Sequence, residues 1–227
     1  MIISASIMCA DLMNLEKECL KLELAGVDRI HIDIMDGRFV NNIELGFSII
    51  KAIRRVTALP FEIHLMTIEP DKYLDKLLDC DGEFICFHIE TTENIDDLVQ
   101  RIRQKNKKAG IVINPQTPAE YLLPYLQSVD MITFMTVEPG FAGQPFKPDV
   151  IHKIRLIKKA ITEKDYDVEL ETDGHMDELT VPEVCKSGAN AIVAGSSSLF
   201  IKGTDYREAV KKIRSWVKDI MIDTKGD

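Results

Sequence analysis

The stretch RIHIDIMDG, residues 29–37, has the composition and alternation of a β-strand. Isoleucines at positions 30, 32 and 34 share one face, because side chains alternate between the two faces of a strand. The opposite face carries His31, Asp33 and Met35. A histidine and a carboxylate are costly to bury unless they are paired or bind a metal. The stretch therefore predicts a strand and, at its carboxyl end, a candidate functional site.

Seven further runs of apolar, β-branched residues alternate with amphipathic segments. We expect the eight strands at residues 2–8, 28–35, 61–66, 83–88, 110–113, 130–137, 167–172 and 190–194. Eight strand–helix units without a low-complexity linker predict a single (β/α)8 barrel, also called a TIM barrel, with residues 1–227 as one catalytic domain. A doubly wound open sheet is the alternative, because it is built from the same alternation.

Two segments carry the Thr-x-x-Glu spacing that is typical of a helix N-terminus. They are Thr117–Glu120, in which proline follows the threonine, and Thr180–Glu183. In a capping box the threonine hydroxyl accepts a hydrogen bond from the first helical turn. We therefore expect a helix to begin at each threonine.

The chain has 227 residues, a formal net charge of −9 and 45% hydrophobic residues. The hydrophobic fraction is ample for a large core. The acidic balance, with no basic run, argues against nucleic acid or an anionic membrane as a partner. The first residues, MIISASIMCADL, lack the long apolar stretch of a signal peptide or a transmembrane segment, so we expect neither.

Five cysteines, an odd number without a CxxC pair, do not fit a disulfide framework or a zinc knuckle. Reduced thiols of a cytosolic protein are the better account. We therefore expect a cytoplasmic location.

Two more strands end in side chains that complement His31 and Asp33. His64 lies near the end of the strand at 61–66, and Asp173 follows the strand at 167–172. Functional residues of a barrel gather at the carboxyl ends of its strands. Two imidazoles and two carboxylates converging there are good ligands for a divalent ion such as Zn, Fe, Co or Mn. The alternative is that each is a hydrogen-bonded barrel residue or a solvated loop residue.

Glycine-rich segments follow three adjacent strands. They are MTVEPGFAGQ at 135–144, Gly174, and AGSSS at 194–198. Glycine lets backbone N–H groups approach an oxyanion closely, and a short helix starting at Ser196 would add its N-terminal dipole. Barrels commonly bind phosphate with the loops after strands seven and eight. Three such loops favour a phosphate site over ordinary turns.

Methionines lie near the ends of four strands, at positions 8, 35, 66 and 135. Methionine there is usually adaptable core, but four together could line a dry pocket around a metal. His88 also ends a strand, and it either contacts the ligand or is a hydrogen-bonded barrel histidine.

These residues resemble one known family over nearly the whole chain, the ribulose-phosphate 3-epimerases. The matching segments are HIDIMDGRFVNN (31–42), HLM (64–66), NPQTP (114–118), MTVEPGFAGQPF (135–146), TDG (172–174) and AGSSSLF (194–200). The first segment and the glycine-rich one are long and specific. The family fold is a (β/α)8 barrel, which agrees with the strands expected above. The resemblance implies an isomerase that acts on a ketose phosphate.

The resemblance also implies a role for each matching position. It makes His31, Asp33, His64 and Asp173 the ligands of one divalent metal ion per chain, with Asp33 and Asp173 also the acid and base. The expected substrate contacts are Ser6, Met35, Met66, Met135, Gly140, Phe141, Ala142, Gly143, Gly174, Gly195 and Ser196. The expected partner is a phosphorylated ketose, and family resemblance implies a homo-oligomer, either a dimer or a hexamer.

The chemistry that we expect is inversion of configuration at C3. A metal on the C2 oxygen would polarise the carbonyl and stabilise an enediolate. One carboxylate would remove the C3 proton, and the other would return a proton to the opposite face. Two carboxylates are required, because a single base returns the proton to the face it came from.

Four positions depart from the family pattern. Ala5 and Asn41 stand where proline is common, and Ala142 and His175 stand where glycine is usual. None removes an expected metal ligand or catalytic carboxylate. The segment GFAGQPF and the pair Met8–Cys9 resemble the D-allulose-6-phosphate 3-epimerase branch more than the pentose branch.

The favoured reaction is therefore between D-allulose 6-phosphate and D-fructose 6-phosphate. One alternative is the same reaction between D-ribulose 5-phosphate and D-xylulose 5-phosphate. Another is a sugar-phosphate-binding barrel without catalysis, against which the presence of both Asp33 and Asp173 counts. A related barrel enzyme, such as a hexulose-phosphate synthase, fits the four-ligand set less well.

Overall fold

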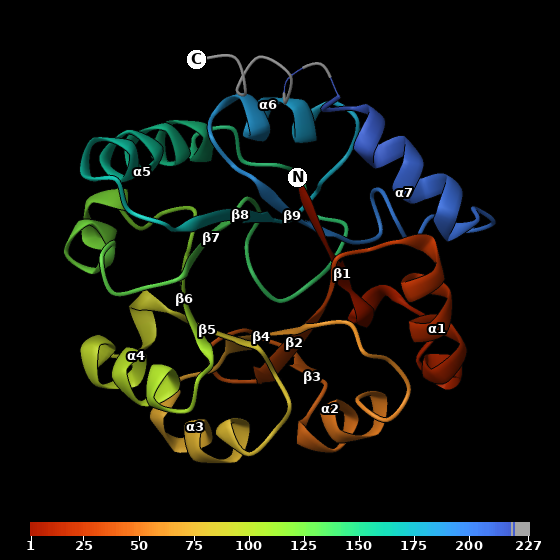
Figure 1. Cartoon of the computed structure of the whole chain (residues 1–227), viewed down its shortest axis with the longest axis horizontal. Coiled ribbons are helices and arrows are strands. Elements are labelled where there is room, and N and C mark those ends of the chain that lie inside the picture. The colour runs from red at the N-terminus through yellow and green to blue at the C-terminus, as the bar shows by residue number, and fades with distance from the viewer. Residues whose placement is uncertain (219, 221–227) are drawn as a thin grey trace.

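Eight parallel strands close into a barrel in a computed structural model that describes residues 1–218 and 220 (Figure 1). The strands are β1 (Ile2–Ser6), β2 (Arg29–Asp36), β4 (Phe61–Met66), β5 (Phe84–His88), β6 (Lys108–Ile113), β7 (Met131–Met135), β8 (Glu169–Asp173) and β9 (Ala191–Ala194). The barrel closes because β1 pairs with both β2 and β9. The predicted (β/α)8 barrel is therefore confirmed, and the open sheet is excluded.

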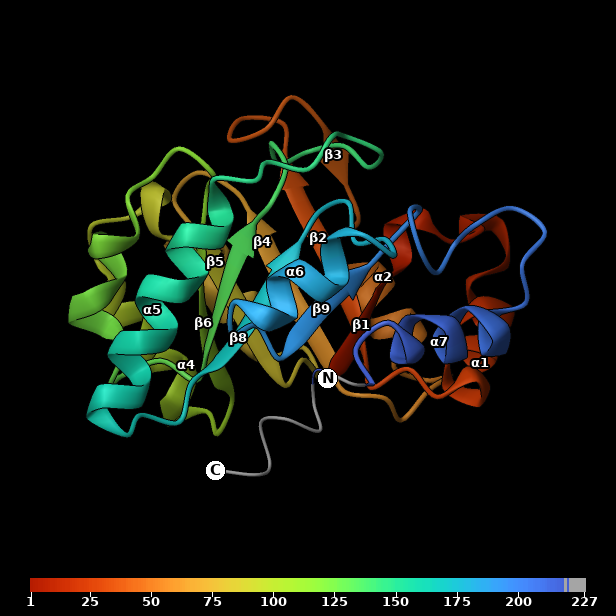
Figure 2. The ribbon, with the colours of Figure 1, turned by 90° about the horizontal axis from the view of Figure 1, so that it is seen from above.

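A ninth strand, β3 (Ile43–Glu44), was not expected. It pairs antiparallel with the end of β2, where Met35 lies opposite Glu44. Figure 2 shows β3 above the barrel, beside the loop that follows β7. The Asn42 side-chain amide donates to the Gly140 carbonyl at 3.0 Å, so this hairpin and the glycine-rich loop are joined over one end of the barrel.

Helices surround the strands on the outside of the barrel (Figure 1). They are α1 (Leu15–Ala25), α2 (Phe47–Ile53), α3 (Asp71–Leu78), α4 (Ile95–Gln104), α5 (Val150–Lys164), α6 (Thr180–Lys186) and α7 (Tyr206–Ser215), with 3-10 turns η1 (Ile7–Cys9), η2 (Leu12–Asn14), η3 (Ile89–Thr91) and η4 (Ala119–Tyr125). Helix α4 shows why they form. It buries Leu98 and Ile102 and has acidic residues in its first turn and arginines in its last, which complements the helix dipole. Among residues 1–218 and 220, no helix combines the length and hydropathy needed to cross a bilayer.

The expected capping boxes are wrong in detail. Thr117 does not cap a helix, because its hydroxyl donates to Glu90 and the following segment is the 3-10 turn η4, which contains Pro124. Helix α6 begins at Thr180 as expected, but Asp177 supplies the cap. Its carboxylate accepts the N–H groups of Leu179 and Thr180. The Thr-x-x-Glu capping box is therefore replaced by a tertiary hydrogen bond at Thr117 and by Asp177 at Thr180.

The two faces of the strands differ sharply in polarity. Outward residues such as Ile32, Ile63 and Ile132 join helical residues in the main hydrophobic core. The inside of the barrel instead buries Arg29 and Glu62, and Arg29 Nη2 donates to both carboxylate oxygens of Glu169 at 2.7 and 2.8 Å. The barrel interior thus combines this polar network with an apolar cluster that includes Cys86, Val112 and Met131. All five cysteines are free thiols, as expected.

Candidate active site

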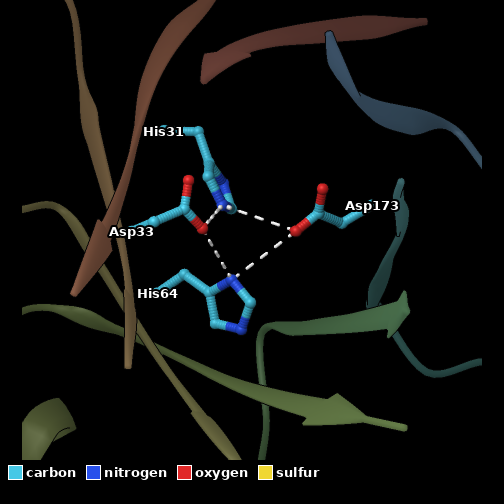
Figure 3. Close-up of side chains that lie close together, drawn as sticks. All are labelled: His31, Asp33, His64 and Asp173. Carbon is cyan, nitrogen blue, oxygen red and sulfur yellow. Dashed lines mark hydrogen bonds and ion pairs between the residues drawn. The ribbon is translucent and has the colours of Figure 1, made fainter. Parts of the chain in front are cut away.

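His31, Asp33, His64 and Asp173 converge inside the barrel at the carboxyl ends of three strands (Figure 3). Strand register sets this arrangement, because Asp33 of β2 lies directly opposite His64 of β4. Asp33 Oδ1 lies 3.2 Å from His31 Nε2 and 3.3 Å from His64 Nδ1. From the other side, Asp173 Oδ2 lies 3.7 Å from His31 Nε2 and 3.6 Å from His64 Nδ1. The two carboxylates thus face each other across two imidazole nitrogens.

The four side chains fit a divalent cation. Each offers one ligand atom, and these atoms lie within 4.8 Å of one another. His64 Nδ1 is buried and has no hydrogen-bond partner of good geometry, which is uncommon for a buried polar atom. Two neutral imidazoles and two carboxylates carry a charge of about −2, which complements a divalent ion. The donor set suits the borderline transition metals named above.

Charge coupling is strong within this cluster. Burial alone would lower the pKa of His31, but the charges of Asp33 and Glu62 raise it well above the usual value. Burial would raise the pKa of Asp33, but the His31 charge, the His31 hydrogen bond and the nearby His64 imidazole lower it below the usual range. The carboxylates therefore favour a proton on His31, which a bound cation would displace.

Two glutamates below the cluster were missed in the sequence analysis. Glu62 Oε1 lies 2.8 Å from His31 Nδ1, and Ser4 Oγ bridges Glu62 at 2.9 Å and Glu171 at 3.0 Å. Burial and the Glu62 charge raise the pKa of Glu171 well above its usual value, which favours its neutral form. The period of two could have revealed both residues, because each precedes a cluster residue by two positions on an inward face.

All the expected substrate contacts line one pocket above the cluster. These eleven are Ser6, Met35, Met66, Met135, Gly140, Phe141, Ala142, Gly143, Gly174, Gly195 and Ser196. Ser6 is nearly buried, and its hydroxyl donates to Asp33 Oδ2 at 2.9 Å. Met8 also lines the pocket, so the four methionines gather there. Cys9, Val137 and Glu138 line it as well and were not expected.

Two glycines in loops that line the pocket, Gly174 and Gly195, are under different steric constraints. Gly174 has φ +118°, and a Cβ there would lie 2.5 Å from Val137 Cγ2, so only glycine fits. Gly195 has no such constraint, since a Cβ would meet only Cys9 Sγ at 3.5 Å. The helix expected at Ser196 is absent. The N–H groups of Ser198, Leu199 and Phe200 all donate to the Gly195 carbonyl, which closes a turn instead of propagating a helix.

His175 occupies a position that favours glycine. Its φ of +52° lies in the left-handed region, which a branched or bulky side chain seldom adopts. Its Nδ1–H donates to the Gln144 carbonyl at 2.8 Å, and its Nε2 lies 3.3 Å from Asp177 Oδ2. The imidazole is therefore held between two loops at the wall of the pocket.

His88 does not line the pocket but lies behind His64. The two Nε2 atoms are 2.9 Å apart, and the His88 Nδ1 lies 3.3 Å from Glu90 Oε2. His88 is fully buried, and burial lowers its pKa to about 4 in spite of Glu90. It is thus a neutral, hydrogen-bonded barrel histidine at neutral pH.

Comparisons with known proteins agree with this geometry. The family model described as "Ribulose-phosphate 3 epimerase family" matches residues 2–200. The chain is 38% identical to the ribulose-phosphate 3-epimerase of Bacillus subtilis over 214 residues, which cover 93% of this chain and 97% of the relative. It is 40% identical to that of Methanocaldococcus jannaschii over 212 residues, or 93% and 89% of the two chains.

Solved structures support the fold. A 3-hexulose-6-phosphate synthase superposes with a TM-score of 0.67 and 16% identity, over 95% of this chain and 99% of that one. A thiamine phosphate pyrophosphorylase from Pyrococcus furiosus gives a TM-score of 0.63 with 16% identity, over 97% and 96% of the two chains. At such low identity these likenesses describe the barrel alone. The family match and the sequence relatives go further, and the chain belongs to the ribulose-phosphate 3-epimerase family of carbohydrate epimerases.

Proposed function

We propose that this chain epimerises a ketose phosphate at C3, with D-allulose 6-phosphate and D-fructose 6-phosphate as the favoured pair. One observation carries the proposal: Asp33 and Asp173 reach the same two imidazoles from β2 and β8, on opposite sides (Figure 3). Inversion needs one group on each face of the carbon, because a lone base returns the proton to the face it came from. Asp33 and Asp173 supply that pair.

The two carboxylates act in opposite protonation states. One removes the C3 proton while the other, already protonated, delivers a proton to the opposite face. The Ser6 hydroxyl holds Asp33 Oδ2, which fixes the direction of the remaining oxygen.

His31, Asp33, His64 and Asp173 would together hold one divalent cation, which when bound polarises the C2 carbonyl and stabilises the enediolate. Zn, Fe, Co and Mn all suit the donor set. We expect about one metal ion per chain after purification, measured by elemental analysis. Full activity in protein stripped by a chelator and verified metal-free would refute this part of the proposal.

The rest of the pocket binds and orients the substrate. Met35, Met66 and Met135 are almost fully buried and present apolar side chains to the reacting carbons. The glycine-rich loops offer backbone N–H groups to the phosphate, and binding at that distance from C3 provides positioning energy.

The preference for a hexulose rests on the far end of the pocket. A hexulose 6-phosphate is one carbon longer than a pentulose 5-phosphate, so the extra carbon must lie between the reacting carbons and the phosphate. Ala142 and His175, which both depart from the family pattern, line the pocket, and we place them beside the extra carbon and the phosphate. They are the residues placed to adjust its length.

The second candidate pair is D-ribulose 5-phosphate and D-xylulose 5-phosphate. The relatives at 38% and 40% identity are named ribulose-phosphate 3-epimerases, which favours it. A comparison of kcat/KM for allulose 6-phosphate and ribulose 5-phosphate decides between the two. We expect a preference for the hexulose of about 10- to 200-fold, the range that one methylene usually provides. A kcat/KM for ribulose 5-phosphate that is equal or higher would reverse the assignment.

We also propose a domain organisation, a cellular location and an oligomeric state for the enzyme. One catalytic domain spans the chain, and five free thiols are compatible with a reducing cytoplasm. The homo-oligomer stays a prediction, which sedimentation analysis would test.

A further inference from the structure

The His64 imidazole is held from behind by a chain of side chains that has no part in the reaction described above. His64 Nδ1 faces the two carboxylates, whereas its Nε2 lies 2.9 Å from His88 Nε2. The two rings are 5.1 Å apart at 24°. A hydrogen bond between two imidazole nitrogens needs one N–H and one lone pair, so the direction of this bond decides which nitrogen of His64 carries its proton.

Glu90 fixes that direction through His88. Glu90 Oε1 accepts the Asn114 N–H at 2.8 Å and the Thr117 hydroxyl, while Oε2 faces His88 Nδ1 at 3.3 Å. Burial raises the pKa of Glu90, but these hydrogen bonds lower it below the usual value, so the group is an acceptor-only carboxylate. His88 Nδ1 must therefore donate to Glu90.

The hydrogen bond from His88 Nδ1 to Glu90 determines which nitrogen of His64 carries a proton. His88 is fully buried, and the Phe39 ring packs against it with centroids 4.5 Å apart, so a second proton on its ring is disfavoured. His88 Nε2 then carries a lone pair and accepts the His64 Nε2–H. A neutral His64 is left with its lone pair on Nδ1, the buried atom that makes no hydrogen bond of good geometry and faces Asp33 and Asp173.

The support for Glu90 comes from the NPQTP segment after β6, whose role the reaction does not explain. The Lys153 ammonium of α5 donates to the carbonyls of Asn114, Pro115 and Thr117 and holds this segment in place. Asn114 and Thr117 in turn hold Glu90. The loop after β6 is thereby connected to the cluster through three side chains.

We propose that His88 and Glu90 are positioning residues that set the tautomer and orientation of His64, so that its Nδ1 lone pair points at the candidate metal site. This inference rests on the proposed role of His64 as a metal ligand. Partners of this kind behind a ligating histidine typically change metal affinity by about 10- to 100-fold when removed.

The test compares His88→Leu with His88→Gln, using Zn²⁺ as the probe. Leucine fills part of the space without an acceptor, whereas the glutamine carboxamide can accept from His64 Nε2–H. His152→Leu is the control, because His152 is exposed on α5 and its loss reports only adventitious Zn²⁺ binding. Affinity is measured by chelator competition on protein whose folding is verified by circular dichroism. We expect a loss of about 10- to 100-fold in His88→Leu, most of it recovered in His88→Gln.

Long-range ¹H–¹⁵N spectra of histidine-labelled parent protein provide a second readout that needs no variant. The inference predicts a proton on His64 Nε2 in the Zn²⁺-loaded protein and, at a pH where the ring is neutral, in the metal-free protein. A proton on Nδ1 of the neutral ring, or a folded His88→Leu variant with parental Zn²⁺ affinity, overturns it. If His88→Leu fails to fold, the spectra and His88→Gln decide. A parent protein that binds no Zn²⁺ through His64 instead refutes the proposed function.

Discussion

Gly174 is the position at which the structure makes its sharpest prediction about a single substitution. It follows β8 directly after Asp173 and has φ +118°. In Gly174→Ala, the new Cβ would lie 2.5 and 2.8 Å from the two methyl groups of Val137 and 3.1 Å from Thr136 Oγ1. Neither neighbour can easily move, because Val137 is buried and the Thr136 N–H donates to the Asp173 carbonyl at 2.8 Å.

Two effects add at this position. A side chain at such a φ costs about 1–3 kcal/mol, and forced overpacking costs about 1–3 kcal/mol more. The free energy of unfolding should therefore fall by about 2–6 kcal/mol. Gly143 provides the matched control. It also has a positive φ, +81°, but a Cβ there would meet nothing within 4 Å, so Gly143→Ala carries only the strain.

Urea unfolding followed by circular dichroism measures both variants. We expect a loss of about 1–2 kcal/mol for Gly143→Ala and a clearly larger one for Gly174→Ala, with similar denaturant slopes. Equal losses in the two variants would show that the contact between residue 174 and Val137 does not constrain the chain, and the argument from close packing would be wrong.

The remaining predictions concern the chemistry, the pocket and the response to acid. Asp33→Asn and Asp173→Asn should each lower kcat by at least about 10²–10⁴-fold. Elemental analysis shows whether each variant still holds its metal. A variant that holds the metal and still has the parental kcat would refute the two-carboxylate scheme. His175→Gly should relieve the backbone strain at the positive φ of residue 175. It should also raise kcat/KM for ribulose 5-phosphate relative to kcat/KM for allulose 6-phosphate. An unchanged ratio of the two values would show that His175 does not select the substrate. Asp36 accepts the N–H groups of Arg38, Phe39 and Ile68, which lower its pKa against the effect of burial. The pKa of Asp36 is thus lower in the folded chain than in the unfolded chain, where it is about 3.9. The ionised Asp36 carboxylate therefore stabilises the fold fully above that unfolded pKa, and this stabilisation is lost as the pH falls through the folded pKa. Urea midpoints measured against pH should therefore fall less steeply in acid for Asp36→Asn than for the parent, and parallel curves would contradict this role.

Much of the barrel could be predicted because its signals are local. The alternation around His31 and Asp33 identifies an inward strand face, and a barrel brings the carboxyl ends of all its strands together. These two facts predict that His64 and Asp173 lie near His31 and Asp33, and strand register then brings their ligand atoms together. Glu62 and Glu171 carry the same period-two signal, but their meaning depends on strand register, which places Glu62 Oε1 against His31 Nδ1.

The features that could not be predicted depend on contacts between distant segments. Thr117 has a capping spacing, yet its hydroxyl bonds Glu90, 27 residues earlier in the chain. Strand β3 is only two residues long and exists because it pairs with the end of β2. The turn after Gly195 replaces a helix because one carbonyl accepts three N–H groups. Local pattern does not reveal any of these choices.

If Asp33 and Asp173 invert C3 by exchanging its proton with solvent, the product must carry a solvent hydrogen at that carbon. The most direct test follows allulose 6-phosphate in D₂O with the metal-loaded enzyme by NMR. Such a reaction yields fructose 6-phosphate that carries deuterium at C3 and nowhere else, with one solvent deuteron for each inversion, and neither Asp33→Asn nor Asp173→Asn should invert C3. Inversion without deuterium at C3, or a protein that catalyses neither inversion nor exchange on either ketose phosphate, would contradict this mechanism.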